Sequence, residues 1–254
     1  MKYPASRTWA CSALVLALSI ASVSAQMPQP AIRVAIHYTI KADRVGEFLS
    51  ATKDYAEALR KGGSERPFGL WASLSGPTEY VVVAHRTKWA ELDVIREPKL
   101  KDMEPQLTAL RSRLNSTVES SHRVIEALEA DLSLPMPSGD PQPMARVLRT
   151  WVRPEHVNAY MALIKSDLLP AAKKSGQKLF SVGRVRFGGS TYQFSTVTAF
   201  ANWAEMDSPP ALTAAMGGEA AYQKFLAKLR PLVTRNEYEM YRFMKDQSVM
   251  PAAK

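Results

Sequence analysis

The stretches Trp89-Ala90-Glu91-Leu92-Asp93 and Trp203-Ala204-Glu205-Met206-Asp207 are nearly the same five residues, present twice in one chain. Each follows a run rich in residues that favour strands, 79–84 in the first case and 193–198 in the second. The likeness extends backwards, because Ile36 to Phe48 aligns with Leu148 to Tyr160 with apolar, basic, acidic and aromatic positions in the same order. We therefore predict two copies of one unit, of about 105 residues each.

A proline-rich stretch from Leu134 to Pro143 separates the two copies. Proline removes a backbone donor and fixes φ, so this stretch is neither a central strand nor the interior of a helix. We interpret it as a linker. The expected organisation is a first repeat at 26–131, a linker at 132–144 and a second repeat at 145–254.

The hydrophobic patterns predict the same order of elements in each copy. Alternating apolar residues indicate strands, and apolar residues at a spacing of three and four indicate helices. The first copy is expected to contain a strand at 32–40, a helix at 43–61, strands at 68–74 and 79–84, a helix at 104–114 and a strand at 121–128. The second is expected to contain the corresponding elements at 146–152, 155–174, 179–187, 193–198, 219–233 and 237–244. This order is that of the ferredoxin-like βαββαβ unit.

Such a unit has helices on one face of its antiparallel sheet, which leaves the other face uncovered. Two copies solve this problem when their bare sheet faces pack together. The predicted fold class is therefore α+β, with two tandem ferredoxin-like repeats packed sheet to sheet as a barrel within one chain.

A family resemblance rests on this element order, on the repeated Trp-Ala-Glu-Leu/Met-Asp segment and on the helix end Pro170-Ala-Ala-Lys-Lys-Ser-Gly176. In these features the sequence resembles the dimeric α+β-barrel superfamily, which includes antibiotic-biosynthesis-type monooxygenases, EthD-like proteins and NIPSNAP proteins. The resemblance implies a lumen between the two sheets, where members of the superfamily bind small molecules. None of the matching residues is a catalytic signature.

Residues 1–25 have the features of a secretory signal peptide. Lys2 and Arg7 make its start basic, residues 12–23 are apolar or small, and Val23-Ser24-Ala25 fits a cleavage site. The apolar stretch is shorter than the ~20 residues of a membrane-spanning helix, and no comparable stretch follows it. We expect a protein that is secreted or periplasmic, with no integral membrane segment after cleavage. The only cysteine, Cys11, lies in this segment, so we expect neither disulfides nor thiolate sites in the mature chain.

The composition is that of a folded, basic protein. Apolar residues make up 46% and charged residues 22% of the chain, which argues against disorder. The formal charge is +9, and removal of Lys2 and Arg7 lowers it by two. A basic surface favours anionic small molecules. The basic residues are scattered rather than arranged in a stripe with aromatic residues, so we do not expect a nucleic-acid partner.

Two of the four histidines are candidates for a catalytic or ligand-binding role inside the barrel. His37 has the opposite strand parity to Val34, Ile36 and Tyr38, so it faces the lumen if those residues face the helices. His85, late in the third strand, is expected near the same space, and either residue is a candidate catalytic base. The alternative is that both are hydrogen-bonded structural histidines. No metal site is expected from their spacing, and no cofactor is expected, with haem bound by a lumen histidine as the alternative.

The second copy offers a basic and aromatic set of candidate ligand-binding residues. By the repeat alignment Arg149 corresponds to His37, and strand alternation groups Arg184 with Arg186. A pocket wall of Arg149, Trp151, Arg184 and Arg186, with His37 from the first copy, would suit an anionic and partly aromatic molecule. The alternative is that the arginines reach solvent or pair with Glu237 and Glu239.

The functional expectation is an exported protein that binds a small organic or anionic molecule in the barrel lumen. One alternative is a cofactor-independent monooxygenase-like enzyme, with His37 or His85 as its base. Another is a non-catalytic assembly module that pairs through strand edges or helices. No nucleophile or acid–base pair stands out in the sequence, so the enzyme question and the oligomeric state stay open. We expect Trp89 and Trp203 to have packing roles, because they recur in both copies.

Overall fold

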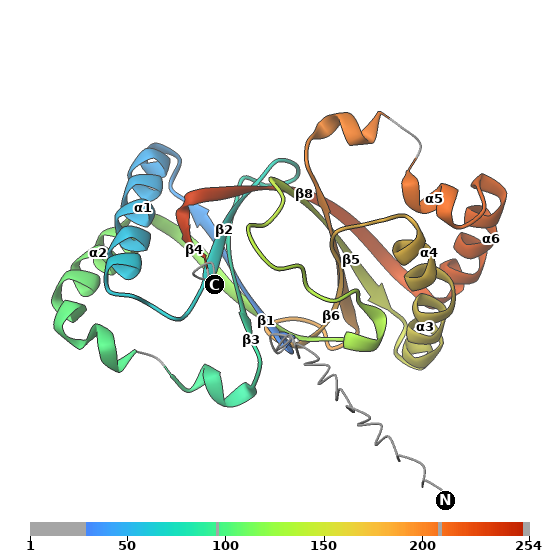
Figure 1. The fold of residues 1–254 in the computed structure, drawn as a ribbon, viewed down its shortest axis with the longest axis horizontal. Coiled ribbons are helices and arrows are strands. Elements are labelled where there is room, and N and C mark those ends of the chain that lie inside the picture. Colours follow the sequence, from blue (N-terminus) through green and yellow to red (C-terminus); the bar gives the residue numbers. More distant parts are fainter. Residues whose placement is uncertain (1–28, 95–96, 208–209, 251–254) are drawn as a thin grey trace, which may run out of the picture.

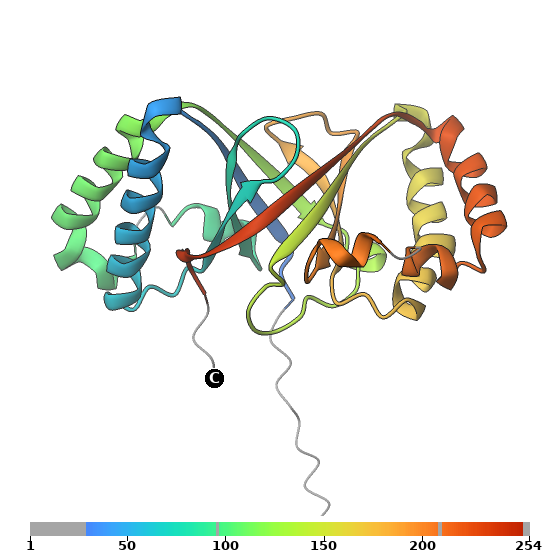
Figure 2. The same ribbon diagram turned by 90° about the horizontal axis from the view of Figure 1, so that it is seen from above.

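The computed structural model describes residues 29–94, 97–207 and 210–250. The expected signal peptide, residues 1–25, lies outside the described residues. The described chain forms two halves around a shared sheet, with a helical layer at each end (Figures 1 and 2). No helix in this part of the chain is long and apolar enough to cross a membrane.

Both halves have the predicted order of elements. The first half consists of β1 (Ile32–Ile40), α1 (Val45–Lys61), β2 (Phe68–Ser73), β3 (Tyr80–Arg86), α2 (Glu104–Thr117) and β4 (Val118–Leu128). The second half consists of β5 (Met144–Val152), α3 (Val157–Leu163), α4 (Leu169–Lys174), β6 (Phe180–Phe187), β7 (Gln193–Phe200), α5 (Ala211–Ala215), α6 (Glu219–Leu229) and β8 (Val233–Val249). The helix expected at 155–174 is interrupted by a π turn, Ile164–Leu168, just before Pro170. Proline has no N–H to continue regular helical bonding at that point.

The eight strands form one closed antiparallel barrel. Its order is β1-β3-β2-β8-β5-β7-β6-β4, and the halves are joined where β2 pairs with β8 and β4 pairs with β6. The two sheets therefore do more than face each other, because backbone hydrogen bonds join their edges. Each of these strands has a neighbour on both sides, so the described barrel has no free strand edge.

The last strand links the halves most extensively. The sequence predicts a strand over 237–244, whereas β8 covers 17 residues and continues along β2 of the first half. Its end, Val249, is buried with Ala56 and Leu59 of α1. The extra residues lie at both ends of the predicted strand: 233–236 pair with β5 of the same half, and the C-terminal end follows β2, a contact between the halves that a local sequence pattern does not contain.

The repeated Trp-Ala-Glu segment forms the same short 3-10 turn after β3 and after β7. In both turns the glutamate accepts a backbone hydrogen bond from four residues earlier, Glu91 from Thr87 (3.2 Å) and Glu205 from Ala201 (2.7 Å). The expectation that both tryptophans are packed is wrong, because Trp89 is 45% and Trp203 is 52% exposed. The capping carboxylate accounts for the repeat of this segment better than the ring does.

Candidate functional site

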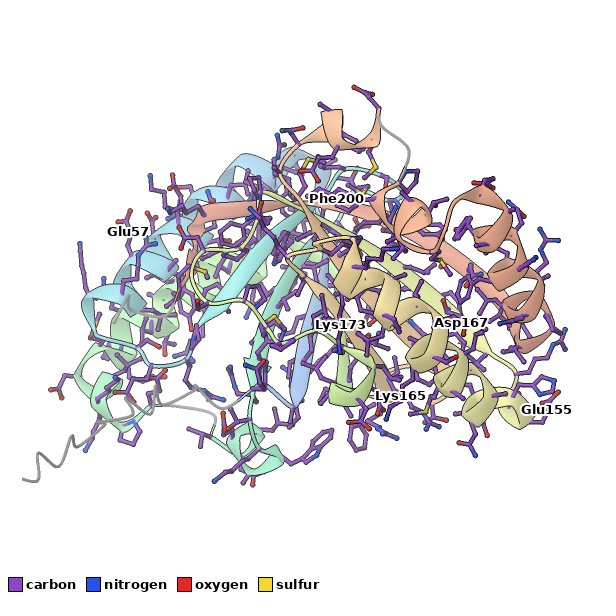
Figure 3. The ribbon with its side chains drawn as sticks, turned by 45° about the vertical axis from the view of Figure 1, so that its right-hand side comes forward. Glu57, Glu155, Lys165, Asp167, Lys173 and Phe200 are labelled. Atoms are coloured by element: carbon purple, nitrogen blue, oxygen red, sulfur yellow. The ribbon has the colours of Figure 1, made fainter. Side chains whose placement is uncertain are left out.

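Strand alternation defines the inner face of the barrel. Ile40, Leu70 and Tyr80 pack with Phe48 of α1 in the helical core of the first half, so residues of opposite parity on these strands face inward. On β1 the inward residues include Arg33 and His37, which are only 6% and 7% exposed. Glu155 and Lys173, labelled in Figure 3, are exposed charged residues of the helical layer of the second half. The charged residues of interest here are those enclosed by the strands.

One inner group, which we call the Arg33 cluster, consists of Arg33, Glu126 and Ser195. Arg33 Nε donates to Glu126 Oε2 at 2.6 Å, and its Nη2 donates to Ser195 Oγ. Ser195 Oγ in turn donates to Glu126 Oε1 at 2.6 Å. The cluster connects β1 and β4 of the first half with β7 of the second. Gly183 on β6 leaves room for it, because a Cβ there would lie 2.8 Å from Arg33 Nη2.

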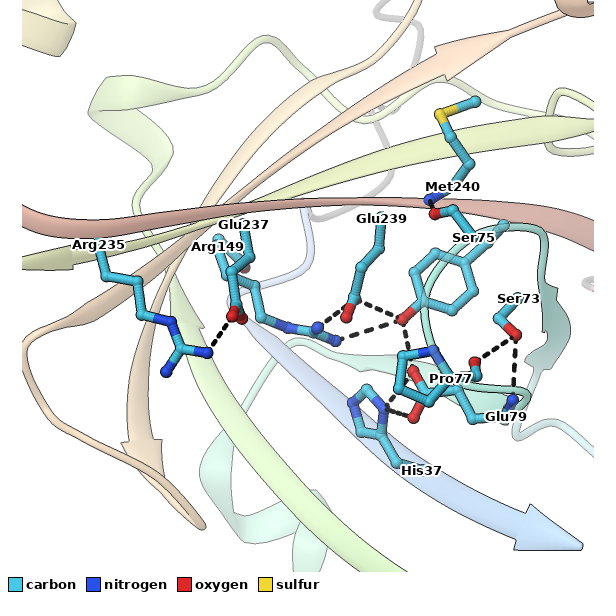
Figure 4. Close-up of polar contacts among 12 residues, drawn as sticks. His37, Ser73, Ser75, Pro77, Glu79, Arg149, Arg235, Glu237, Glu239 and Met240 are labelled. Carbon is cyan, nitrogen blue, oxygen red and sulfur yellow. Dashed lines mark hydrogen bonds and ion pairs between the residues drawn. The ribbon is translucent and has the colours of Figure 1, made fainter.

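A second inner group, the Tyr241 cluster, consists of His37, Glu79, Tyr241, Glu239 and Arg149 (Figure 4). His37 Nδ1 lies 3.1 Å from each carboxylate oxygen of Glu79. The Tyr241 hydroxyl lies 2.6 Å from Glu79 Oε1 and 2.7 Å from Glu239 Oε2. Arg149 pairs with Glu239 and donates to the Tyr241 oxygen at 3.3 Å. Polar contacts therefore run without a break from a histidine of the first half to an arginine of the second.

The hairpin between β2 and β3 positions Glu79 at this end of the barrel. Ser73 Oγ accepts from Glu79 N at 3.0 Å and donates to Pro77 O at 2.8 Å, which closes the loop on itself. Ser75 Oγ accepts from Met240 N on β8 at 2.9 Å. These contacts fix the hairpin against β8 and bring Glu79 to Tyr241.

The Tyr241 cluster contains more hydrogen-bond contacts than its ionised form can satisfy. A phenol has one hydrogen, and an ionised carboxylate only accepts. Tyr241 is within 2.7 Å of oxygens of both Glu79 and Glu239, so its single hydrogen serves one of the two contacts. The other becomes a hydrogen bond when one of these carboxyls is protonated. The geometry thus suits one proton more than the fully ionised carboxylates hold.

The neighbours of Glu79 and Tyr241 shift their pKa values in opposite directions. Although burial acts the other way, the hydrogen bonds from His37 and Tyr241 lower the pKa of Glu79 below its usual value. Burial, together with the two carboxylates, raises the pKa of the Tyr241 hydroxyl. Glu79 is therefore a carboxylate and Tyr241 a neutral phenol at neutral pH.

His37 has one ring nitrogen occupied and one that points elsewhere. With Nδ1 at Glu79, Nε2 lies on the side of the ring away from that carboxylate (Figure 4). The ring stacks on His122 of β4, an exposed residue, with 4.5 Å between centroids and 9° between planes. Burial and the charge of His37 lower the pKa of His122. A carboxylate that orients one imidazole nitrogen and leaves the other available is the usual arrangement of a histidine base.

His85 faces the interior as well, but at the Arg33 cluster. In the pairing of β1 with β3 it lies opposite Arg33, whereas His37 lies opposite Val81. Burial, with Arg33 and Arg86 acting in the same direction, lowers the pKa of His85 to about 3. An imidazole with that pKa is neutral and a poor base, so the structure favours His37 among the two candidates.

The predicted arginine wall is not brought together. Arg149 lies in the Tyr241 cluster, and it forms the alternative pairing with Glu239. Trp151 is on the same face of β5 and lies under the guanidinium of Arg235, 4.8 Å from its ring centre. Arg184 and Arg186 share the face of Val182, which is buried in the helical core, so they lie outside the barrel. Arg184 donates to Thr191 O at 2.9 Å and Arg186 pairs with Glu129. The sequence interpretation had assigned Arg184 and Arg186 to the inner face of β6, whereas they lie on its outer face.

The described residues contain no cluster of metal ligands, and other side chains cross the interior beside His85. Among the described residues no group of three or more His, Cys, Asp or Glu is arranged to hold a metal ion. A haem ligated by a lumen histidine would need open space beside that residue. The contact from Arg33 to Ser195 crosses the interior beside His85, and a haem bound there would have to break it.

Five of the residues in these clusters were not among the sequence candidates: Arg33, Glu79, Glu126, Ser195 and Tyr241. The sequence did contain a signal for these residues, because polar residues occupy alternate positions on strands whose other face is apolar. Arg33 and His37 on β1, and Glu237, Glu239 and Tyr241 on β8, follow this pattern. Such alternation indicates a polar interior when both faces of a sheet are covered.

Comparison with known proteins yields matches at the level of structure. No family model matches the chain, and no curated protein matches its sequence. Two similar solved structures, each described as a "putative monooxygenase", come from Lactobacillus acidophilus NCFM and Fusobacterium nucleatum. They share 10% and 13% identity, cover 89% and 85% of this chain and 98% and 94% of their own, and both have a TM-score of 0.59.

A further structure, a mutant chlorite dismutase from Candidatus Nitrospira defluvii, shares 10% identity over 86% of this chain and 95% of its own, with a TM-score of 0.52. An anthrone oxidase-like protein shares 10% identity over 85% of this chain and 92% of its own, with a TM-score of 0.54. At this identity the likeness concerns the fold, and it extends over both halves. The chain therefore shares the barrel fold of these proteins, with both halves of the barrel in one polypeptide.

Proposed function

We propose that this protein binds a small organic molecule with an acidic proton at the His37 end of its barrel, and that His37 removes this proton. The observation that carries the proposal is the unbroken polar chain from His37 through Glu79 and Tyr241 to Glu239 and Arg149. Glu79 holds Nδ1 of the imidazole, which leaves Nε2 to act as the base. His37 itself would keep the proton that is removed, and the Glu79 carboxylate would stabilise the imidazolium that forms.

The charges inside the barrel favour a neutral ligand over an anion. Arg149 is paired with Glu239 and Arg33 with Glu126, so neither inner guanidinium is available to a carboxylate or phosphate ligand. A phenol, a quinol or an activated CH₂ group arrives uncharged and becomes an anion only as His37 accepts its proton. The paired arginines and the neutral phenol of Tyr241 would stabilise that anion at a distance.

The fold supports an oxidation as the reaction that follows. Proteins described as monooxygenase and anthrone oxidase-like share this barrel. In the reaction proposed, an activated CH₂ loses its first hydrogen to His37 as a proton, and the carbanion reacts with dioxygen. The carbon ends as a carbonyl holding one oxygen atom, and the second oxygen atom leaves as water with the two hydrogens of the CH₂. Dioxygen is the oxidant, and no cofactor is required for the balance.

The assembly alternative has little support in the barrel itself. Each described strand is paired on both sides, so association through a free strand edge is not available.

Oxygen consumption with anthrones, phenols and quinols tests the proposal. The purified protein is expected to consume oxygen with at least one of these classes. His37→Gln is expected to lower the rate by about 10²–10⁴-fold, the usual contribution of a general base. His156→Gln is the matched control, because His156 lies in the 3-10 turn before α3, outside the barrel.

Three outcomes of this experiment differ in meaning. An equal rate for His37→Gln and the unaltered protein would contradict the assignment of the base. A small organic mass retained in native mass spectrometry, without oxygen consumption, would leave a binding protein and remove the catalytic part. An empty protein that is inert toward every class tested would contradict both parts.

We also propose that the protein is exported, on the strength of the composition of residues 1–25. The mass of the protein recovered from periplasm or medium tests this directly. A mature chain that begins at Gln26 is expected. A cytoplasmic protein that retains residues 1–25 would contradict export.

A further inference from the structure

The two Trp-Ala-Glu turns are equivalent in sequence but lie in different surroundings. Trp89 meets Phe187 of the other half in an edge-on contact, with 6.0 Å between ring centroids. Trp203 makes no such ring contact within the described residues. It opens instead onto a groove of about 230 Å³ between the halves, lined by Leu74, Pro143, Met144, Ala201, Asn202, Trp203 and Arg242. Both tryptophans are exposed, but Trp89 contacts an aromatic ring of the other half, whereas Trp203 lines a groove.

The groove combines an apolar floor with three polar groups. Leu74, Pro143 and the buried Met144 supply the floor. The polar groups are the guanidinium of Arg242, the amide of Asn202 and the indole of Trp203. None of these side chains has a hydrogen bond or ion pair to another described residue, in contrast to Arg33 and Arg149 inside the barrel.

The unpaired groups define the chemistry of the ligand that fits. Guanidinium and indole N–H groups only donate hydrogen bonds, and the Asn202 amide can donate as well. Arginine binds a carboxylate through two parallel hydrogen bonds, and an exposed tryptophan offers a flat apolar surface to a ring. The groove is smaller than pockets that enclose drug-sized ligands, which measure about 300–1,000 Å³, so it suits a molecule with a single ring.

We propose that this groove is a binding site for a small aromatic carboxylic acid. The ring lies against Trp203 and the apolar floor, and the carboxylate receives hydrogen bonds from Arg242 and from Asn202. The basic character of the chain, +9 for the full sequence and two charges less without Lys2 and Arg7, favours the approach of an anion. This site is on the outside of the barrel and is independent of the proposed reaction at His37.

Calorimetric titration with benzoate tests the site, with benzyl alcohol as the uncharged analogue. Benzoate is expected to bind saturably with one molecule per chain, and benzyl alcohol to bind at least about tenfold more weakly. Arg242→Gln is expected to weaken benzoate binding by about tenfold or more, because a charge-assisted pair of hydrogen bonds is lost. Arg235→Gln, on the same strand and outside the groove, is the matched control.

A second pair of variants uses the internal repeat. Trp203→Ala is expected to weaken benzoate binding, and Trp89→Ala to leave it unchanged. Thermal unfolding of each variant shows whether the fold is intact, and Arg242 and Trp203 are both exposed enough to be replaced without loss of a core contact. Absence of saturable benzoate binding would overturn the proposal, as would equal binding by Arg242→Gln. Loss of benzoate binding in His37→Gln but not in Arg242→Gln would also overturn it, because the ligand would then bind inside the barrel.

Discussion

The Arg33 cluster and the Tyr241 cluster both connect the two halves across the barrel interior, but they are built to different ends. In the Arg33 cluster, arginine and serine donate into one carboxylate, and the charged partners are 8% and 7% exposed. In the Tyr241 cluster, one phenol hydrogen faces two carboxylates, and a histidine next to an exposed residue completes the chain. In the Arg33 cluster the buried carboxylate has a donor at each oxygen. In the Tyr241 cluster one phenol hydrogen has two carboxylate neighbours, and His37 stacks on the exposed His122.

This difference separates structure from function within one lumen. A buried charge pair that is fully hydrogen-bonded has no free donor or acceptor for a ligand, but loss of one partner lowers the free energy of unfolding strongly. A polar chain with an unfilled proton position at the mouth of a barrel is suited to proton transfer. The variants below are chosen to break one cluster while the other stays intact.

The largest effect on stability is expected for Glu126→Ala in the Arg33 cluster. The change leaves the Arg33 guanidinium buried without its carboxylate, so we expect a loss of about 3–5 kcal/mol in the free energy of unfolding. Urea denaturation measures it. The double variant Arg33→Met with Glu126→Leu removes both charges and is expected to recover most of this loss. A double variant as unstable as Glu126→Ala would contradict this explanation, because the loss of stability would then not come from an unpaired buried charge.

Gly183→Ala tests the same cluster from its neighbour. The added Cβ would lie 2.8 Å from Arg33 Nη2 and 2.9 Å from Glu126 Oε2, so the pair must shift. We expect a loss of about 1–3 kcal/mol in unfolding free energy. Gly46→Ala in α1 is the matched control, because its Cβ would have no neighbour within 4 Å. That change is expected to stabilise by up to about 1 kcal/mol, and equal effects at both glycines would count against a tight site at Gly183.

A smaller and pH-dependent effect is expected for Tyr241→Phe. The hydroxyl helps to hold the pKa of Glu79 below its ordinary value of 4.5, so its contribution is present above that pH and disappears as Glu79 is protonated in acid. We expect the variant to be less stable by about 1 kcal/mol at neutral pH. In denaturation curves recorded from neutral to acid pH, the two proteins should converge below the ordinary glutamate pKa. A constant difference across the range would separate Tyr241 from the ionisation of Glu79.

The smallest effect concerns the ionisation of His122. Burial and the charge of the stacked His37 lower its pKa below the ordinary value. His37→Gln removes the charge and leaves the burial, so the pKa of His122 is expected to rise part of the way toward 6.5, as read from its NMR titration. An unchanged value would show that the stacked ring exerts no electrostatic influence on His122.

Much of the fold could be predicted from the sequence, because it depends on local patterns. The strand predicted at 32–40 has the observed bounds of β1, and the duplicated Trp-Ala-Glu segment marks the same turn in both halves. What the local pattern did not contain were contacts between the halves. The pairing of β8 with β2 extends the last strand beyond its predicted C-terminal end, and the π turn before Pro170 depends on how one helix accommodates a missing donor.

The candidate site was predicted only in part, and parity explains why. His37 and Arg149 were placed on the inner face because alternation along β1 and β5 is regular. Arg184 and Arg186 were placed there as well, although they share a face with the buried Val182. Glu79 and Tyr241 meet only because the hairpin of the first half is tied to β8 of the second, and no spacing in the sequence shows that contact.

Hydrogen–deuterium exchange at an activated carbon tests the central claim most directly. Anthrone is dissolved in D₂O without oxygen, so that its CH₂ can exchange but cannot be oxidised, and the loss of its proton signal is followed by NMR. The protein and the His156→Gln control should accelerate the exchange, and His37→Gln should lose most of that acceleration. Equal acceleration by His37→Gln would contradict the account, because the proton would then leave the substrate without the imidazole that Glu79 orients.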